Sequence, residues 1–185
     1  MKLICAAIVL TLLAQGKKEN PDLKVDEQAG LSIGKMPKND EWGFKDKPFF
    51  EKAKVAVGHK VDELEIDVFS VLPAPNQSGW DLKKQAEIDF GNFSSAPGVT
   101  EMKKVSHQDK VALPRGGGNG ALGTYMEMSF KRQDKPMEYR YWSFTSRSNS
   151  NLYLVLVHGE EGMYKKHQKI VDFVLGTIQT YKLPK

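Results

Sequence analysis

Four histidines, the side chains that most often move protons near neutral pH, stand at His59, His107, His158 and His167. None lies two or four residues from another, and no HExxH-type zinc signature is present. His107 is followed two residues later by Asp109, so a small hydrolase or metal-dependent enzyme using His107, Asp109 and His158 is the catalytic alternative. His167 falls on the apolar stripe of a helical pattern, which indicates a histidine at the boundary of the core.

Carboxylates recur with a two-residue period at Glu63, Glu65 and Asp67. This period places all three on one side of a predicted strand. Acid–base catalysis needs two groups whose pKa values are pushed apart by their surroundings. Three like charges in a row are more typical of a solvated face, and we interpret them so.

A glycine-rich run follows Arg115, from Gly116 to Gly120. It lacks the Gly-Lys-Ser/Thr of a phosphate loop, and a strand rather than a helix follows it. We predict a flexible connection there. Since no Gly-x-Ser-x-Gly nucleophile motif is present either, the sequence predicts no catalytic set, no metal site and no cofactor.

Tyrosines offer a candidate binding surface on the strands near the C-terminus. Tyr139 and Tyr141 share one side of a predicted strand, and Tyr125 is expected beside them. With Arg115 in the preceding loop, these residues would form a patch suited to a protein partner. The alternative is ordinary packing of aromatic residues within a sheet.

The elements that must position these residues are grouped strands and two helices. Alternation of apolar and polar residues predicts strands, of which the strongest are 64–71, 122–132, 137–144 and 151–158, with weaker ones at 30–36, 42–44, 53–59, 99–105 and 110–113. The last three strong strands are joined by short polar turns and should form an antiparallel meander.

Helical spacing appears twice. Leu82, Ala86, Phe90 and Phe93 recur on one side of a predicted helix with Asp81 as its N-cap. A longer apolar stripe runs from residue 163 to 181 and should cover the strand 152–157. Grouped strands with two main helices predict the α+β class, with an antiparallel sheet backed by those helices.

The N-terminus has the plan of a secretory signal peptide over residues 1–16. Lys2 supplies the charge, Leu3 to Leu13 the apolar run, and Ala14 and Gly16 the small residues at the cleavage site. The apolar run is too short for a membrane-spanning helix, which needs about 20 residues. We therefore expect an exported protein, periplasmic or secreted.

Behind the signal peptide we expect a flexible polar leader at 17–28 and a single α+β domain at 29–185. Removal of the signal would remove the only cysteine, Cys5, so no disulfide or thiolate site is expected. Lys and Arg number 27 against 23 Asp and Glu, with a net charge of +4 and both signs interspersed. This pattern argues against a nucleic-acid binder and allows only weak attraction to an anionic surface.

Three features of the chain resemble the PsbP/Mog1-like superfamily, which includes exported bacterial proteins of unassigned role. The first is an opening Gly30-Leu31-Ser32-Ile33 followed by Pro37 and Trp42. The second is the strand 152–157 that leads through Gly159-Glu160 into a helix. The third is the ending of that helix, Phe173-Val174-Leu175-Gly176-Thr177-Ile178.

The resemblance spans about residues 29–182, and the run from Gly116 to Gly120 departs from it as an added loop. It implies an antiparallel sheet backed by helices, and accessory or binding roles. We therefore expect an exported non-enzymatic binding or accessory protein with a protein partner in the cell envelope. The alternatives are the enzyme described above and a peripheral envelope protein that binds anionic lipid.

Overall fold

The computed structural model describes residues 22–35, 38–74, 77 and 79–183. The expected signal peptide lies outside these residues. Among the helices within them, none has the length and apolar character needed to cross a bilayer.

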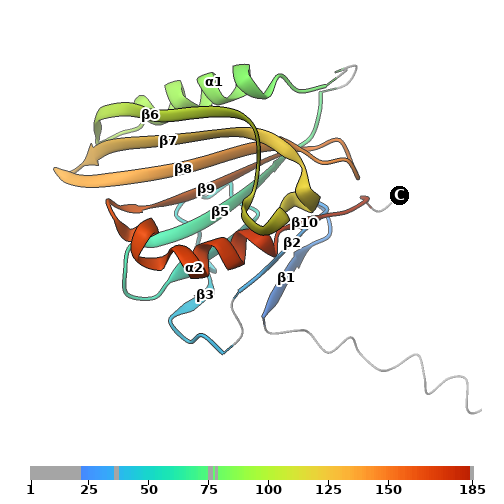
Figure 1. Cartoon of the computed structure of the whole chain (residues 1–185), viewed down its shortest axis with the longest axis horizontal. Helices are drawn as coiled ribbons and strands as arrows, with labels where there is room; N and C mark the ends of the chain where they lie inside the picture. Colours follow the sequence, from blue (N-terminus) through green and yellow to red (C-terminus); the bar gives the residue numbers. More distant parts are fainter. Residues whose placement is uncertain (1–21, 36–37, 75–76, 78, 184–185) are drawn as a thin grey trace, which may run out of the picture.

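Seven antiparallel strands form the main sheet (Figure 1). Their order across the sheet is β3-β4-β5-β9-β8-β7-β6, with β3 at Trp42–Phe44, β4 at Val55–His59, β5 at Leu64–Val71, β6 at Val99–Ala112, β7 at Leu122–Arg132, β8 at Lys135–Thr145 and β9 at Leu152–Glu160. The expected meander of β7, β8 and β9 is confirmed by their pairing. The two weak strands expected at 99–105 and 110–113 are one long strand, β6.

A smaller sheet joins the first and last strands that the structure describes. Strands β1 (Leu23–Asp26) and β10 (Gln179–Thr180) pair on either side of β2 (Leu31–Gly34), all antiparallel. The prediction of a flexible leader over residues 17–28 is therefore wrong for residues 23–26, because β1 is bonded to β2 along its whole length.

Helix α1 (Leu82–Ser94) begins at the predicted cap, where the Asp81 carboxylate accepts a hydrogen bond from the Lys84 amide at 3.0 Å. Its Ala86 is buried among methionines and tyrosines of β7 and β8, and the partly buried Phe90 and Phe93 pack on the same cluster. The helical spacing thus identified both the helix and its buried side.

Helix α2 (Met163–Gly176) is shorter than the apolar stripe that predicted it. The stripe continues to Tyr181, but the Thr177 hydroxyl donates to the Val174 carbonyl and accepts from the Gly34 amide at 2.8 Å. After this turn the chain joins β2 as β10. The last apolar residues therefore belong to the small sheet.

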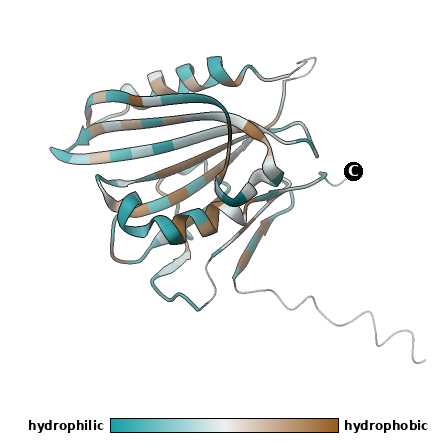
Figure 2. Cartoon of the chain, viewed as in Figure 1, coloured by the Kyte–Doolittle hydropathy of each residue, from teal (hydrophilic) through white to brown (hydrophobic). Residues whose placement is uncertain are grey.

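The two helices cover opposite sides of the main sheet. Val155 and Val157 of β9 pack with Val171 and Leu175 of α2, as predicted, whereas the intervening Leu156 belongs to the cluster beneath α1. Successive side chains of a strand point to opposite sides, so β9 is buried on both. Hydrophilic and hydrophobic residues alternate along α2 (Figure 2), as its position over a core requires.

The run from Gly116 to Gly120 is packed rather than freely mobile, which corrects the expected flexible loop. It forms two short turns, Pro114–Gly116 and Gly118–Gly120. Gly117 is buried so closely against α2 that a side chain there would overlap the Leu175 carbonyl. The Gly118 amide donates to the carbonyl of Ile178 at 2.7 Å.

Candidate functional site

A pocket of about 440 Å³ opens at the end of the main sheet where β4 turns into β5 and β7 turns into β8. This is the end at the left of Figure 1, where β9 leads into α2. Among its lining residues are Phe49, Glu65, Arg132, Tyr139 and His158. The strand register explains the gathering, because Glu65 of β5 and Tyr139 of β8 both pair with His158 of β9.

A buried carboxylate–imidazole pair connects His158, which lines this pocket, with Asp67, which does not. The Asp67 Oδ2 atom is 2.8 Å from His158 Nε2, and the two residues are 0% and 6% exposed. Asp67 follows Glu65 by two residues and so points to the same side of β5. The second oxygen of Asp67, Oδ1, is buried without a hydrogen-bond partner among the described residues.

Burial sets the protonation of this pair. It raises the pKa of the Asp67 carboxyl to about 7 and lowers the pKa of the His158 imidazole to about 4, because both charged forms lose hydration. Burial also raises the pKa of Glu65, although the Phe49 amide donates to its Oε1 at 2.8 Å.

Aromatic rings enclose the pair. The rings of Phe49 and Phe50 lie 4.9 and 5.4 Å from the His158 ring, and that of Tyr139 lies 5.9 Å away. The guanidinium of Arg132 lies over the Phe49 ring at 4.4 Å. A charged group thus borders an apolar enclosure, where electrostatic contacts are stronger than in water.

Some cations at the rim of the pocket are already paired with a carboxylate, and others are not. The Lys135 ammonium is 2.9 Å from Glu160 and 3.7 Å from Glu63. Within the part of the chain that the structure describes, Arg132 and Lys60 take part in no ion pair. These two side chains are cations available to an incoming anion, together with Lys45, which also lines the pocket and whose ammonium donates to the His59 carbonyl at 3.4 Å.

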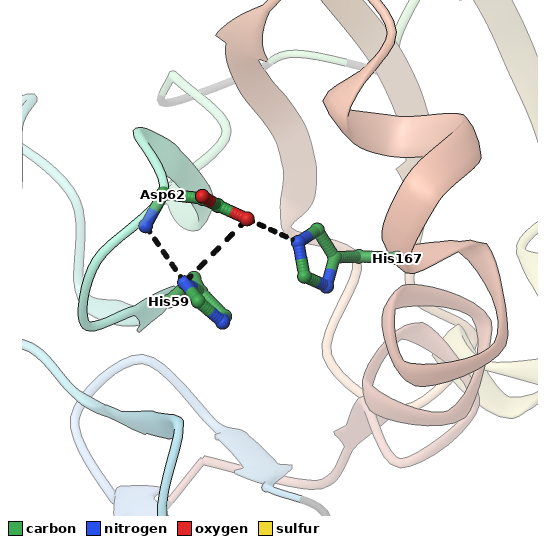
Figure 3. Close-up of side chains that lie close together, drawn as sticks. All are labelled: His59, Asp62 and His167. Atoms are coloured by element: carbon green, nitrogen blue, oxygen red, sulfur yellow. Dashed lines mark hydrogen bonds and ion pairs between the residues drawn. The ribbon is translucent and has the colours of Figure 1, made fainter.

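A second histidine–carboxylate group lies beside the pocket, on the side of the sheet covered by α2 (Figure 3). The Asp62 Oδ2 atom is 2.6 Å from His167 Nε2 of α2 and 3.9 Å from His59 Nδ1 at the end of β4. The Trp42 ring packs edge-on against both imidazoles. His167 is therefore a boundary residue, as its place on the helix predicted.

The polar atoms of this second group already have hydrogen-bond or ionic partners, within the group and around it. His59 Nδ1 accepts hydrogen bonds from the amides of Val61 and Asp62, the latter at 2.8 Å. The Lys166 ammonium is 2.7 Å from Asp62 Oδ2. Hydrogen bonds from Lys166 and His167 lower the pKa of Asp62 to about 2, so this carboxylate is already neutralised by its neighbours.

The expected tyrosine surface is not found. Tyr139 and Tyr141 are 5% and 1% exposed, and both belong to the core beneath α1. Tyr125 lies on the other side of the sheet, where its hydroxyl accepts a hydrogen bond from Arg140 at 2.9 Å. Arg115 is exposed on the turn next to α2. The alternative, ordinary sheet packing, describes Tyr139 and Tyr141.

The histidines of the catalytic alternative are also separated. His107 lies in β6 and His158 in β9, three strands apart and therefore about 14 Å from each other. His107 Nε2 is 3.7 Å from Asp109, and its Nδ1 is 3.4 Å from Glu87 of α1. A single site that uses His107, Asp109 and His158 is excluded by this distance.

The predicted solvated row of carboxylates is correct only at its first member. Glu63 has 65% of its side chain exposed, whereas Asp67 is fully buried. The alternation correctly placed the carboxylates on one side of the strand. It could not show that the segment with Phe49 and Phe50 covers that side.

The comparisons with known proteins give the fold. No protein-family model matches the sequence, and no curated protein matches it. The structure is similar to that of cyanobacterial PsbP (CyanoP) from Synechocystis sp. PCC 6803, with a TM-score of 0.59 and 11% identity over 90% of this chain and 96% of that one. It is also similar to LpqN of Mycobacterium tuberculosis, with a TM-score of 0.54 and 10% identity over 82% and 83%.

The Ran-binding protein Mog1p of Saccharomyces cerevisiae gives a lower TM-score of 0.44, with 8% identity over 88% of this chain and 96% of Mog1p. The expected fold is confirmed by the likeness to CyanoP and LpqN, and the α+β class by the two helices and the antiparallel sheets. At such identities the likeness extends to the fold alone.

Proposed function

We propose that this chain, which has the PsbP-like fold, is an exported, non-enzymatic binding protein that holds a small anionic molecule in the pocket beside His158. The observation that carries the proposal is Arg132, a cation without an ionic partner in the described structure, stacked on Phe49 at the pocket wall. A guanidinium held in this way offers its planar fork of donors to a carboxylate or a phosphate.

The size and composition of the pocket support a small ligand. Its volume of about 440 Å³ lies within the range of ligand sites, which runs from about 300 to 1,000 Å³. Phe49 and Tyr139 provide apolar contact, and Lys60 adds a second cation at the rim. A molecule with an anionic head and a compact apolar body matches this wall.

Export is supported by the signal-peptide pattern of residues 1–16. LpqN, which shares the fold, is described as involved in cell envelope biogenesis, and an envelope setting agrees with that pattern. A protein partner in the envelope and weak binding to anionic lipid stay predictions that await their own measurements.

Calorimetric titration of the purified protein with a panel of small carboxylates and phosphates tests the pocket. We expect at least one compound to bind, and Arg132→Gln to weaken its binding about 10-fold or more, since a charge-assisted hydrogen bond contributes about 1.5–3 kcal/mol. Arg147→Gln removes the same charge from the exposed turn between β8 and β9 and should leave affinity unchanged. Equal affinity of Arg132→Gln and the unaltered protein would overturn the proposal.

A further inference from the structure

We propose that Glu65, Asp67 and His158 form a binding site for a divalent transition-metal ion at the inner wall of the pocket. One ligand atom from each residue lies within 4.8 Å of the others. The inference deepens the proposed function, because a metal ion there would face the anionic molecule in the pocket.

Backbone register brings the three side chains together. Glu65 and His158 are directly opposite each other in the antiparallel pair of β5 and β9, and residues paired in this way present their side chains on the same side of the sheet. Asp67 follows on that side. Because all three positions lie on paired strands, the ligands are held by a rigid framework, as metal sites require.

The enclosure leaves one oxygen of Asp67 poorly satisfied. Asp67 is fully buried, and its Oδ1 has no hydrogen-bond partner of ordinary geometry among the described residues. The Phe50 amide and the Glu65 carboxyl are the polar groups that interact with the Asp67 carboxyl from its own side of the sheet. A buried polar oxygen without a partner is costly. A divalent cation bound to both carboxylates would provide a partner for this oxygen.

The donor set selects the class of metal. One imidazole nitrogen with two carboxylates suits Zn²⁺ and related transition metals, whereas Ca²⁺ and Mg²⁺ prefer oxygen ligands alone. Three protein ligands leave a fourth position, and Glu65 and His158 line the pocket toward which that position would open. An anion held by Arg132 is placed to complete the coordination.

The group of His59, Asp62 and His167 consists of two imidazoles and one carboxylate, and its ligand atoms also lie within 4.8 Å of one another, but it is a weaker candidate. The Lys166 ammonium already contacts Asp62 at 2.7 Å. The Nδ1 lone pair of His59 is used by two backbone amides. A metal ion would have to displace these partners, whereas Asp67 Oδ1 accepts no hydrogen bond of ordinary geometry from the described residues.

The test is calorimetric titration of the chelator-treated, full-length folded protein with ZnCl₂. We expect one site, and we expect His158→Gln and Asp67→Asn each to weaken Zn²⁺ binding at least 10-fold. Glu63→Gln removes an equal charge from an exposed neighbour of the same strand, and Asp62→Asn alters the other histidine group. Both control variants should bind Zn²⁺ as the unaltered protein does.

Circular dichroism shows whether each variant is folded. Should Asp67→Asn fail to fold, Glu65→Gln and His158→Gln decide the question. Co²⁺ in place of Zn²⁺ adds a visible absorption spectrum that reports nitrogen and oxygen coordination, and this spectrum should be lost in His158→Gln. The inference is overturned if the protein binds neither Zn²⁺ nor Co²⁺. It is also overturned if Asp62→Asn loses metal binding while His158→Gln keeps it.

Repeating the anion panel with and without Zn²⁺ separates the two proposals. Zn²⁺ binding without any anion binding supports the metal site and rejects the proposed function. Anion binding that depends on Arg132, in a protein that binds no Zn²⁺, supports the proposed function and rejects the metal site.

Discussion

Asp67 and Asp89 are two aspartates enclosed on the same side of the main sheet. They differ in how many of their carboxylate oxygens have a hydrogen-bond partner. Asp89 of α1 accepts hydrogen bonds from the Tyr141 hydroxyl at 2.6 Å and from Gln85 at 3.0 Å. Asp67 has His158 at one oxygen and no hydrogen-bond partner at the other among the described residues. We therefore interpret Asp89 as part of the packing and Asp67 as part of a site.

At Asp89 this interpretation gives a pH-dependent prediction. Burial raises the pKa of its carboxyl, so the folded protein holds this proton more tightly than the unfolded chain does. Its contribution to stability is complete below the ordinary Asp pKa of about 3.9 and is lost as pH rises through the raised value. Asp89→Asn, which keeps an acceptor for Tyr141, should therefore gain stability relative to the unaltered protein as pH rises through that interval.

Urea unfolding of both proteins at pH 3 and pH 7 provides the measurement. A difference in unfolding free energy that is the same at both pH values would contradict the assignment. Tyr141→Phe, which leaves Asp89 Oδ2 without its donor while Gln85 still donates to Oδ1, should cost about 1–3 kcal/mol.

At the scale of elements, glycines of α1 and of the 114–120 turns should respond in opposite ways to alanine. Gly91 lies in α1 with open space around it, so Gly91→Ala should stabilise the protein by about 1 kcal/mol through helix propensity. A methyl group at Gly117 would overlap the Leu175 carbonyl, so Gly117→Ala should destabilise by about 1–3 kcal/mol. Chemical denaturation followed by circular dichroism measures both, and a neutral Gly117→Ala would mean that the turns do not pack on α2.

Local patterns predicted the elements whose partners are near in sequence. The alternation of 64–71 and 122–132 gave β5 and β7, and Asp81 marked the start of α1. The end of α2 was missed because Thr177 bonds to Gly34, 143 residues away. An apolar stripe cannot distinguish a continuing helix from a strand that joins a distant partner.

The candidate site was missed for the same physical reason. Asp67 and His158 are 91 residues apart, and only the pairing of β5 with β9 brings them together. The row of alternating carboxylates was visible in the sequence. That Phe49 and Phe50 would cover it depends on how a segment without regular structure folds back over the sheet.

At the scale of the whole molecule, the proposal of export has a direct measurement. Expressed with its own N-terminus in a bacterium, the protein should appear outside the cytoplasm with Lys17 as its first residue, because Ala14 and Gly16 match the small residues read by signal peptidase. N-terminal sequencing of the exported fraction tests this. Retention in the cytoplasm with Met1 intact would reject the signal peptide.

The two edges of the main sheet bear on how copies of this protein behave when crowded. One edge is β3, only three residues long, and the other is β6, whose register against β7 shifts at three places. Positive φ angles at Glu101 and Lys110 accompany these irregularities, and lysines recur along the strand. Short, bulged and charged edges are poor templates for the strands of another copy. The chain is thereby protected against edge-to-edge aggregation, and concentrated solutions should resist the growth of cross-β fibrils.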